Sequence, residues 1–270
     1  MDLRKADSTA LSKLLKDYEG FSELFAMEES NQVNQIDLNC DTDAIDAKVN
    51  RLLPGMRRDE FPVFVLEDPA VKETDNIETR CEEILKSRKS ECYGQTYEFD
   101  VNAFLSIPDG VPTYHWYFCI FKEVLRDCQF LLEMVLSDGC KERCATMNAT
   151  DGYEYLCSCH PKAVKCPAAE YYYHNLNFCT LHLFSIETIL QDASSKAQDI
   201  QKEMFASLRR LYRLYLHAFY QHYGAFAEAE KRRHMYAKFF GFVTCSGLLS
   251  ERDMKPYLSL DEMNEFDYGS

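Results

Sequence analysis

Two cysteines and two histidines form a set that is typical of a structural metal site. Cys140 and Cys144 are separated by three residues, and His217 and His222 are separated by four. Zinc in structural sites is held tetrahedrally by four such sulfur and nitrogen ligands. The long stretch between the two pairs leaves an alternative open, in which one histidine packs in the core, the other is solvated and the thiols are simply buried.

The histidine spacing also constrains the backbone. Residues five positions apart on an ideal helix differ by about 140° around its axis, so His217 and His222 cannot both face one ion from a regular helix. We therefore expect irregular backbone near Gln221 to Gly224.

A second group of potential ligands is compact in sequence. Cys157, His160, Cys166 and His174 lie within eighteen residues, and Cys159 could replace a neighbouring ligand. A bound ion would stabilise a polar loop that has few apolar residues of its own. In the alternative interpretation, the two cysteines are buried thiols in a reducing compartment and the histidines are solvated.

Three arginines form a local basic cluster. Arg209, Arg210 and Arg213 fall within an arc of about 100° on a predicted helix, with Leu211, Ala218 and His222 opposite them. Guanidinium groups on one face can make bidentate hydrogen bonds to a phosphate. A solvated helix face is the ordinary alternative for such a charge cluster.

Composition and motifs exclude several classes of function. The 270 residues include 44 acidic and 30 basic side chains, a formal charge of −14, which argues against a nucleic-acid partner. No glycine-rich nucleotide loop and no H-E-x-x-H motif is present, so we expect no enzyme. We find neither a signal peptide nor a membrane span, and we expect a cytoplasmic protein, where the 12 cysteines indicate metal ligands or buried thiols.

The elements that must position these residues are helices. Apolar spacing predicts long helices over 114–136, 171–191, 196–222 and 229–242, with a small β-hairpin formed by 153–157 and 163–166. Turn residues interrupt the chain over 107–112. We therefore predict an all-α helix bundle with one short β excursion.

The region before the bundle is more acidic than the rest. Residues 1–110 carry 24 acidic and 13 basic side chains, a net charge of −11. We expect helices over 11–25 and 75–89, a polar stretch over 28–50, and either a linker or an edge strand at 61–66.

Three segments resemble the Mob family of kinase co-regulators: Cys140–Ala149, Tyr153–Tyr155 and Arg209–His222. Cys157–Pro161, Lys165–Ala168 and Tyr171–His174 are similar to the phocein branch. The resemblance covers about 104–258 and leaves a divergent acidic region over 1–103 and an acidic tail over 259–270. In one respect the sequence departs from the family, which usually places four residues between the two cysteines, whereas this chain has three.

The resemblance implies a fold, a cofactor and a mode of binding. It implies a four-helix core, no catalytic activity, and a structural zinc bound by Cys140, Cys144, His217 and His222. It also implies that Arg209, Arg210 and Arg213 bind phosphothreonine peptides of protein kinases. The phocein branch implies a scaffolding role with sterile-20-like kinases, striatin and type-2A protein phosphatase, whereas other Mob branches activate NDR/LATS-type kinases directly. A structural subunit without phosphopeptide binding is a further alternative.

Overall fold

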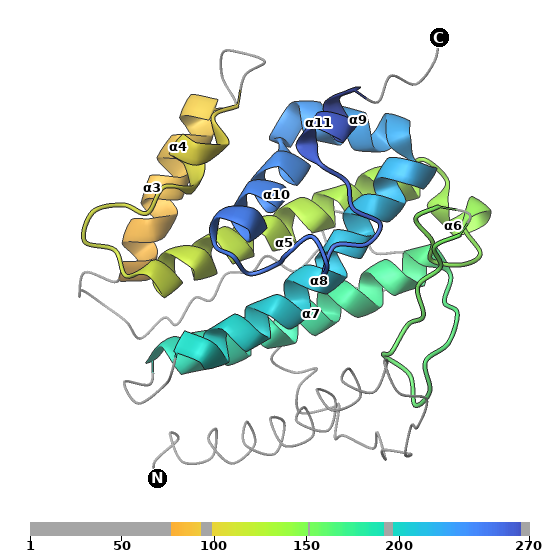
Figure 1. The fold of residues 1–270 in the computed structure, drawn as a ribbon, viewed down its shortest axis with the longest axis horizontal. Coiled ribbons are helices and arrows are strands. Elements are labelled where there is room, and N and C mark those ends of the chain that lie inside the picture. Colours follow the sequence, from red (N-terminus) through yellow and green to blue (C-terminus); the bar gives the residue numbers. More distant parts are fainter. Residues whose placement is uncertain (1–76, 93–98, 151, 192–196, 266–270) are drawn as a thin grey trace. The chain divides into compact units, whose positions relative to one another are not determined.

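The computed structural model describes residues 77–92, 99–150, 152–191 and 197–265, which Figure 1 draws as a coloured ribbon. The chain divides into two compact units, Met1–Val49 with Cys157–Val164, and Asn50–Leu156 with Lys165–Ser270. Residues 157–164 are the described part of the smaller unit. The expected helix over 11–25, the polar stretch 28–50 and the segment 61–66 lie outside the described residues. The predicted boundaries at 103 and 258 stay a prediction.

The larger unit is helical, which confirms the predicted all-α class. None of the helices described is both long and apolar enough to cross a membrane. The predicted helices over 75–89, 114–136, 171–191 and 196–222 correspond to α3, α5, α7 and α8. The full order is α3 (Ile77–Cys92), α4 (Val101–Leu105), α5 (Thr113–Ser137), α6 (Cys140–Arg143), α7 (Ala168–Gln191), α8 (Ala197–Gln221), α9 (Tyr223–Arg233), α10 (Met235–Cys245) and α11 (Leu260–Glu265).

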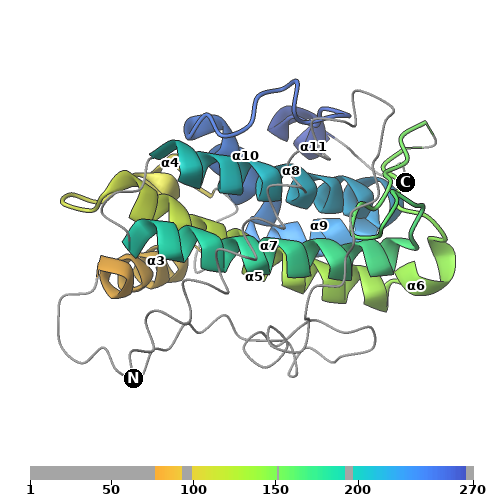
Figure 2. The same cartoon turned by 90° about the horizontal axis from the view of Figure 1, so that it is seen from below.

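The core of this unit lies between α5, α7 and α8. These three long helices contact one another, and α5 also contacts α3, α9 and α10 (Figures 1 and 2). Apolar residues recur around most of α5, so this helix is buried on nearly every side, with Trp116, Phe121 and Leu131 fully covered. The shorter helices α9 and α10 pack against α5, and a four-helix core stays a prediction.

Turn residues fix both ends of α5. The expected turn over 107–112 is present, with Gly110 at φ 73°, and α5 begins directly after Pro112. At the other end Gly139 adopts φ 77°, a left-handed conformation that costs glycine little and commonly ends helices. The chain then enters α6 at once, which places Cys140 immediately beyond the end of α5.

The helix predicted over 229–242 is wrong as a single element. The chain forms α9 and α10, and His234 separates them in a left-handed conformation at φ 49°. The Glu230 carboxylate accepts hydrogen bonds from the amides of Tyr236 (2.7 Å) and Ala237 (3.1 Å), so it caps the new helix. Neither glycine nor proline marks this break, and apolar periodicity continues across it.

The predicted β-hairpin is not present as a ladder, and the described residues form isolated bridges in its place. Within the smaller unit, Cys157 and Val164 exchange backbone hydrogen bonds of 2.7 and 3.0 Å. Within the larger unit, a separate bridge joins Asn148 to Glu154. Pro161, between Cys157 and Val164, has no amide proton to donate to a ladder.

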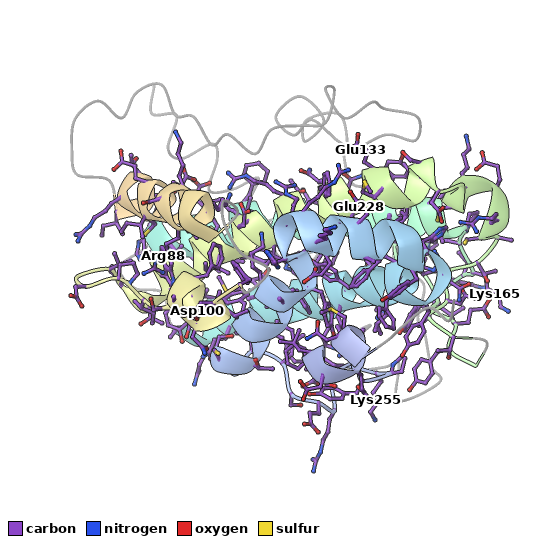
Figure 3. The ribbon with its side chains drawn as sticks, turned by 90° about the horizontal axis from the view of Figure 1, so that it is seen from above. Arg88, Asp100, Glu133, Lys165, Glu228 and Lys255 are labelled. Carbon is purple, nitrogen blue, oxygen red and sulfur yellow. The ribbon has the colours of Figure 1, made fainter. Side chains whose placement is uncertain are left out.

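Side chains tie α3 and α4 together at one end of the helical unit, where Figure 3 shows Arg88 and Asp100. The Arg88 guanidinium donates to the carbonyl oxygens of Phe104 (2.8 Å) and Ser106 (2.6 Å), at the C-terminal end of α4. Asp100 accepts from the amide of Ala103 at 2.9 Å and caps the start of α4. Lys165 lies at the opposite end of the view (Figure 3).

Candidate metal centre and arginine face

The structure brings together the four residues of the first predicted metal set. The ligand atoms of Cys140, Cys144, His217 and His222 all lie within 4.8 Å of one another. Cys140 Sγ is 3.6 Å from His217 Nε2, and Cys144 Sγ is 3.3 Å from His222 Nε2. In a tetrahedral zinc site a sulfur and a nitrogen ligand are about 3.6 Å apart, given the usual metal–ligand distances. The four residues could therefore hold a metal ion, and their donor atoms fit zinc.

Local backbone geometry creates this arrangement. Cys140 and Cys144 lie at the two ends of the single turn α6, in which the Cys144 amide donates to the Cys140 carbonyl at 3.0 Å. One helical turn brings both thiols to the same side, so the shortened cysteine spacing still permits a site. His217 lies on α8, whereas His222 follows the end of α8 with φ −140° and ψ 44°. This break is the irregular backbone expected near Gln221 to Gly224.

Hydrogen bonds behind the histidines orient their rings. His217 Nδ1–H donates to the carbonyl oxygen of Asn148 at 2.7 Å, and His222 Nδ1–H donates to Asp138 Oδ2 at 2.7 Å. Arg143 in turn donates to the Asp138 carboxylate. Both Nε2 atoms are therefore left as acceptors that face the cysteines, as is common in zinc sites. Sequence analysis did not identify Asp138 or Asn148, because no motif distinguishes a residue that supports a ligand.

Burial controls the protonation of the four side chains. It lowers the pKa of His217 to about 4 and also lowers the pKa of His222, so both rings are neutral and able to bind a metal at pH 7. Burial raises the pKa values of the Cys140 and Cys144 thiols. Metal binding to these cysteines must therefore release protons, and the affinity of the site depends on pH.

The second predicted metal set is divided between the two compact units. Cys166 and His174 belong to the larger unit, where Cys166 Sγ is 3.8 Å from His174 Nδ1. Cys157 and His160 belong to the smaller unit, and the Cys157 side chain is buried. A site that combines the two pairs stays a prediction.

The predicted face of three arginines needs a correction at Arg210, which is only 2% exposed. Its guanidinium donates to Asn175 Oδ1 at 2.8 Å and lies 3.8 Å from the centroid of the Phe178 ring. An arc on an isolated helix does not reveal which neighbour will cover part of it, and here α7 covers Arg210. This residue supports the contact between α7 and α8 and does not reach a surface ligand.

Arg209 and Arg213 are half-buried and lie one turn apart on α8. The Arg209 guanidinium lies 5.5 Å from the Phe205 ring. Arg213 donates to the hydroxyl of Tyr171 at 3.0 Å and lies 5.3 Å from the Tyr155 ring. Because His217 follows Arg213 by one turn, α8 connects the metal centre to this pair, which we call the arginine face.

Comparison with known proteins identifies the family of this chain. Residues 94–257 match the Mob1/phocein family. The chain is 26% identical to the MOB kinase activator-like 4 of Drosophila melanogaster over 155 residues, which are 57% of this chain and 69% of that protein. It is 30% identical to the MOB-like protein phocein of Caenorhabditis elegans over 124 residues, 46% of this chain and 55% of the relative. Since the family match covers more than half of its length, this chain belongs to the Mob1/phocein family.

Proposed function

We propose that this protein is a non-catalytic, zinc-stabilised adaptor that binds phosphorylated segments of protein kinases through Arg209 and Arg213. The observation that carries the proposal is the arrangement on α8, where the arginine face and a histidine of the candidate metal centre lie on one continuous helix. A rigid helix presents the two guanidinium groups at a fixed spacing, which reduces the entropy lost on binding.

Zinc, held by Cys140, Cys144, His217 and His222, would have a structural role here. Four protein ligands leave no open position on a tetrahedral ion, so the ion stabilises the fold and activates no water. The cysteines follow α5 and the histidines come from the end of α8, so the site fastens these two helices together. The same arrangement keeps the arginine face in a constant orientation with respect to the core.

The names of the two relatives guide the choice of partner, since one is a MOB kinase activator-like protein and the other is a MOB-like phocein. We propose sterile-20-like kinases as partners, within a cytoplasmic assembly that contains a striatin-like scaffold and a type-2A protein phosphatase. Direct activation of an NDR/LATS-type kinase is the alternative that the kinase-activator name favours.

Binding of phosphorylated peptides tests this function. The probe is a fluorescent peptide library with a fixed central phosphothreonine, compared with the same library carrying threonine. A charge-assisted hydrogen bond to the phosphate contributes about 1.5–3 kcal/mol to binding, so we expect the phosphorylated library to bind at least tenfold more tightly. Arg209→Ala with Arg213→Ala should abolish this preference, whereas Arg232→Ala on α9, which removes an exposed arginine paired with Glu228, should leave it unchanged.

The contrary result would favour the structural-subunit alternative. If the wild-type protein binds both libraries equally, or if the double arginine variant keeps the preference, the arginine face does not recognise phosphate. The protein would then act through another surface.

A further inference from the structure

One face of α7 holds the arginines of α8. Tyr171, Asn175 and Phe178 are spaced by four and three residues, so they lie along one side of α7. Asn175 and Phe178 contact Arg210, and Tyr171 contacts Arg213. The two arginines are themselves three residues apart, which matches the spacing of the residues that hold them.

We propose that Tyr171 and Tyr155 are positioning residues that fix the Arg213 guanidinium for recognition of a phosphate monoester. This inference rests on the proposed function, because it assigns the residues that orient one of its two arginines. Neither tyrosine is required to touch the phosphate. Each acts through Arg213, Tyr171 by a hydrogen bond to Nη1 and Tyr155 by a cation–π contact of its ring.

The surroundings of Tyr171 restrict its side chain. It is fully buried within the second turn of α7, and its hydroxyl accepts the hydrogen bond from Arg213 Nη1 at 3.0 Å. The Asn175 amide nitrogen donates to the Tyr171 carbonyl at 2.8 Å, so the same residue that holds Arg210 also contacts the Tyr171 backbone. A fixed acceptor at one nitrogen sets the plane of the guanidinium, whose remaining N–H groups then point in defined directions.

Tyr155 restrains Arg213 from a second direction. Its side chain is 8% exposed, and its ring centroid lies 5.3 Å from Arg213 Cζ, within the range of a cation–π contact. Its hydroxyl donates to the Lys255 carbonyl at 3.0 Å, and its amide donates to the Met147 carbonyl at 2.8 Å. Both ends of Tyr155 are therefore anchored, one of them to the C-terminal segment at Lys255, which Figure 3 labels.

Holding Arg213 in advance should strengthen phosphate binding. An arginine side chain has many rotamers, and fixing them during binding weakens the complex. When the tyrosines have already restricted Arg213, that ordering no longer opposes binding. Loss of the Tyr171 hydroxyl should lower the affinity for the phosphothreonine library by about three- to tenfold, and loss of the Tyr155 ring should have a similar effect.

A double-mutant cycle separates positioning from general destabilisation. We would measure phosphothreonine-library binding for Tyr171→Phe and Tyr155→Leu, alone and combined with Arg213→Ala. The matched control is Tyr236→Phe, which removes a buried hydroxyl that donates to the Leu258 carbonyl in the same C-terminal segment as Lys255. We expect each tyrosine change to weaken binding when Arg213 is present and to have no further effect when it is absent, and we expect the control to bind as the wild type does.

Nuclear magnetic resonance of ¹⁵N-arginine-labelled protein makes the test independent of the ligand. We expect resolved Nη signals for Arg213, assigned by their loss in Arg213→Ala, and averaging of those signals in Tyr171→Phe but not in Tyr236→Phe. Unchanged Arg213 signals in Tyr171→Phe would overturn the positioning role even if the phosphopeptide binds. Conversely, signals that average as expected in a protein that does not prefer the phosphorylated library would support positioning of Arg213 and overturn the proposed function alone.

Discussion

At the metal centre, burial and hydrogen bonding prepare the histidines to bind a metal ion. The pKa of His217 is lowered to about 4 by burial, and the neutral ring donates through Nδ1 to Asn148. His222 donates to Asp138, whose pKa is lowered chiefly by this hydrogen bond. Asp138 therefore orients the candidate ligand His222 and is not itself one of the four candidate ligands.

Asp138→Asn should weaken zinc binding. An asparagine can still accept the hydrogen bond from His222, but it removes the negative charge that strengthens the ring as a ligand. We expect zinc affinity to fall by about 10- to 100-fold, as for other carboxylates that support a ligating histidine. Competition with a chromophoric chelator would measure it. Asp261→Asn, an exposed change in the first turn of α11, is the control and should leave the affinity unaltered.

A buried ionic cluster connects α5 to α10. Lys238 Nζ lies 2.5 Å from Asp127 Oδ2 and 3.4 Å from Glu123 Oε1, and all three residues are at most 1% exposed. Lys89 of α3 pairs with Glu123 as well. Burial alone would raise the pKa of Glu123, but Lys238 and Lys89 lower it to about 2. Removing one carboxylate would leave a buried positive charge with less compensation.

Glu123→Gln should therefore destabilise the protein in a pH-dependent way. The folded-state pKa of Glu123 lies below its ordinary value of 4.5, so its contribution is present above pH 4.5 and is lost as the pH falls towards 2. At pH 7 we expect a loss of about 3–5 kcal/mol in the free energy of unfolding. Urea unfolding of the wild type and of Glu123→Gln, both without metal and at pH 7 and pH 3.5, would measure the difference in their free energies of unfolding. A loss of the same size at both pH values would show that Glu123 does not act as a charged partner.

Sequence reasoning grouped the four residues that the structure brings together at the candidate metal centre. It took Cys140, Cys144, His217 and His222 as one possible set from residue type and spacing, and the resemblance to the Mob family assigned that set to zinc. It failed at Arg210, because a helical arc contains no information about the facing helix. It also could not identify Asp138, since acidic residues are common and their support of a ligand depends on geometry.

At the scale of elements, close approach of α4 and α10 depends on Gly241. A Cβ atom added there would lie 2.2 Å from Val101 Cγ1 and 3.0 Å from Leu105 Cδ1. Glycine weakens a helix interior relative to alanine, so its presence in α10 is explained by packing and not by helix propensity.

Gly241→Ala should consequently destabilise the protein although alanine favours helices. The overlap with Val101 requires α4 to move, and overpacking of this kind costs about 1–3 kcal/mol. Thermal unfolding should show a lower midpoint. Gly224→Ala is a suitable control, because a Cβ at Gly224 in α9 meets no atom within 4 Å. A midpoint for Gly241→Ala at or above that of the wild type would mean that α4 can shift at this crossing without loss of stability.

The break at His234 shows what apolar periodicity misses. The His234 ring stacks on Phe99 with centroids 4.7 Å apart, and the Glu230 carboxylate caps α10. The first contact depends on the tertiary structure, and the second forms only where the chain turns at His234. The end of α8 at His222 was predictable, in contrast, because two ligands five residues apart impose a geometric condition on the backbone.

Across the whole molecule, the helical class and three of the four predicted long helices followed from apolar spacing, and the family followed from a few motifs. The division of residues 157–164 from the larger unit was not predictable, because it depends on which parts of the chain contact one another. The four candidate ligands come from the turn that follows α5 and from the end of α8, the helix that bears the arginine face, so a zinc ion bound there would fasten these two parts together.

The zinc content of the purified protein tests this account most directly. Elemental mass spectrometry would compare the wild type with Cys144→Ser, with Cys245→Ser as control, since Cys245 is exposed at the end of α10. We predict that Cys144→Ser contains one zinc ion per chain fewer than the wild type, whereas the control contains the same amount. A wild-type protein without zinc when prepared in the absence of chelators, or equal zinc in Cys144→Ser, would contradict the account.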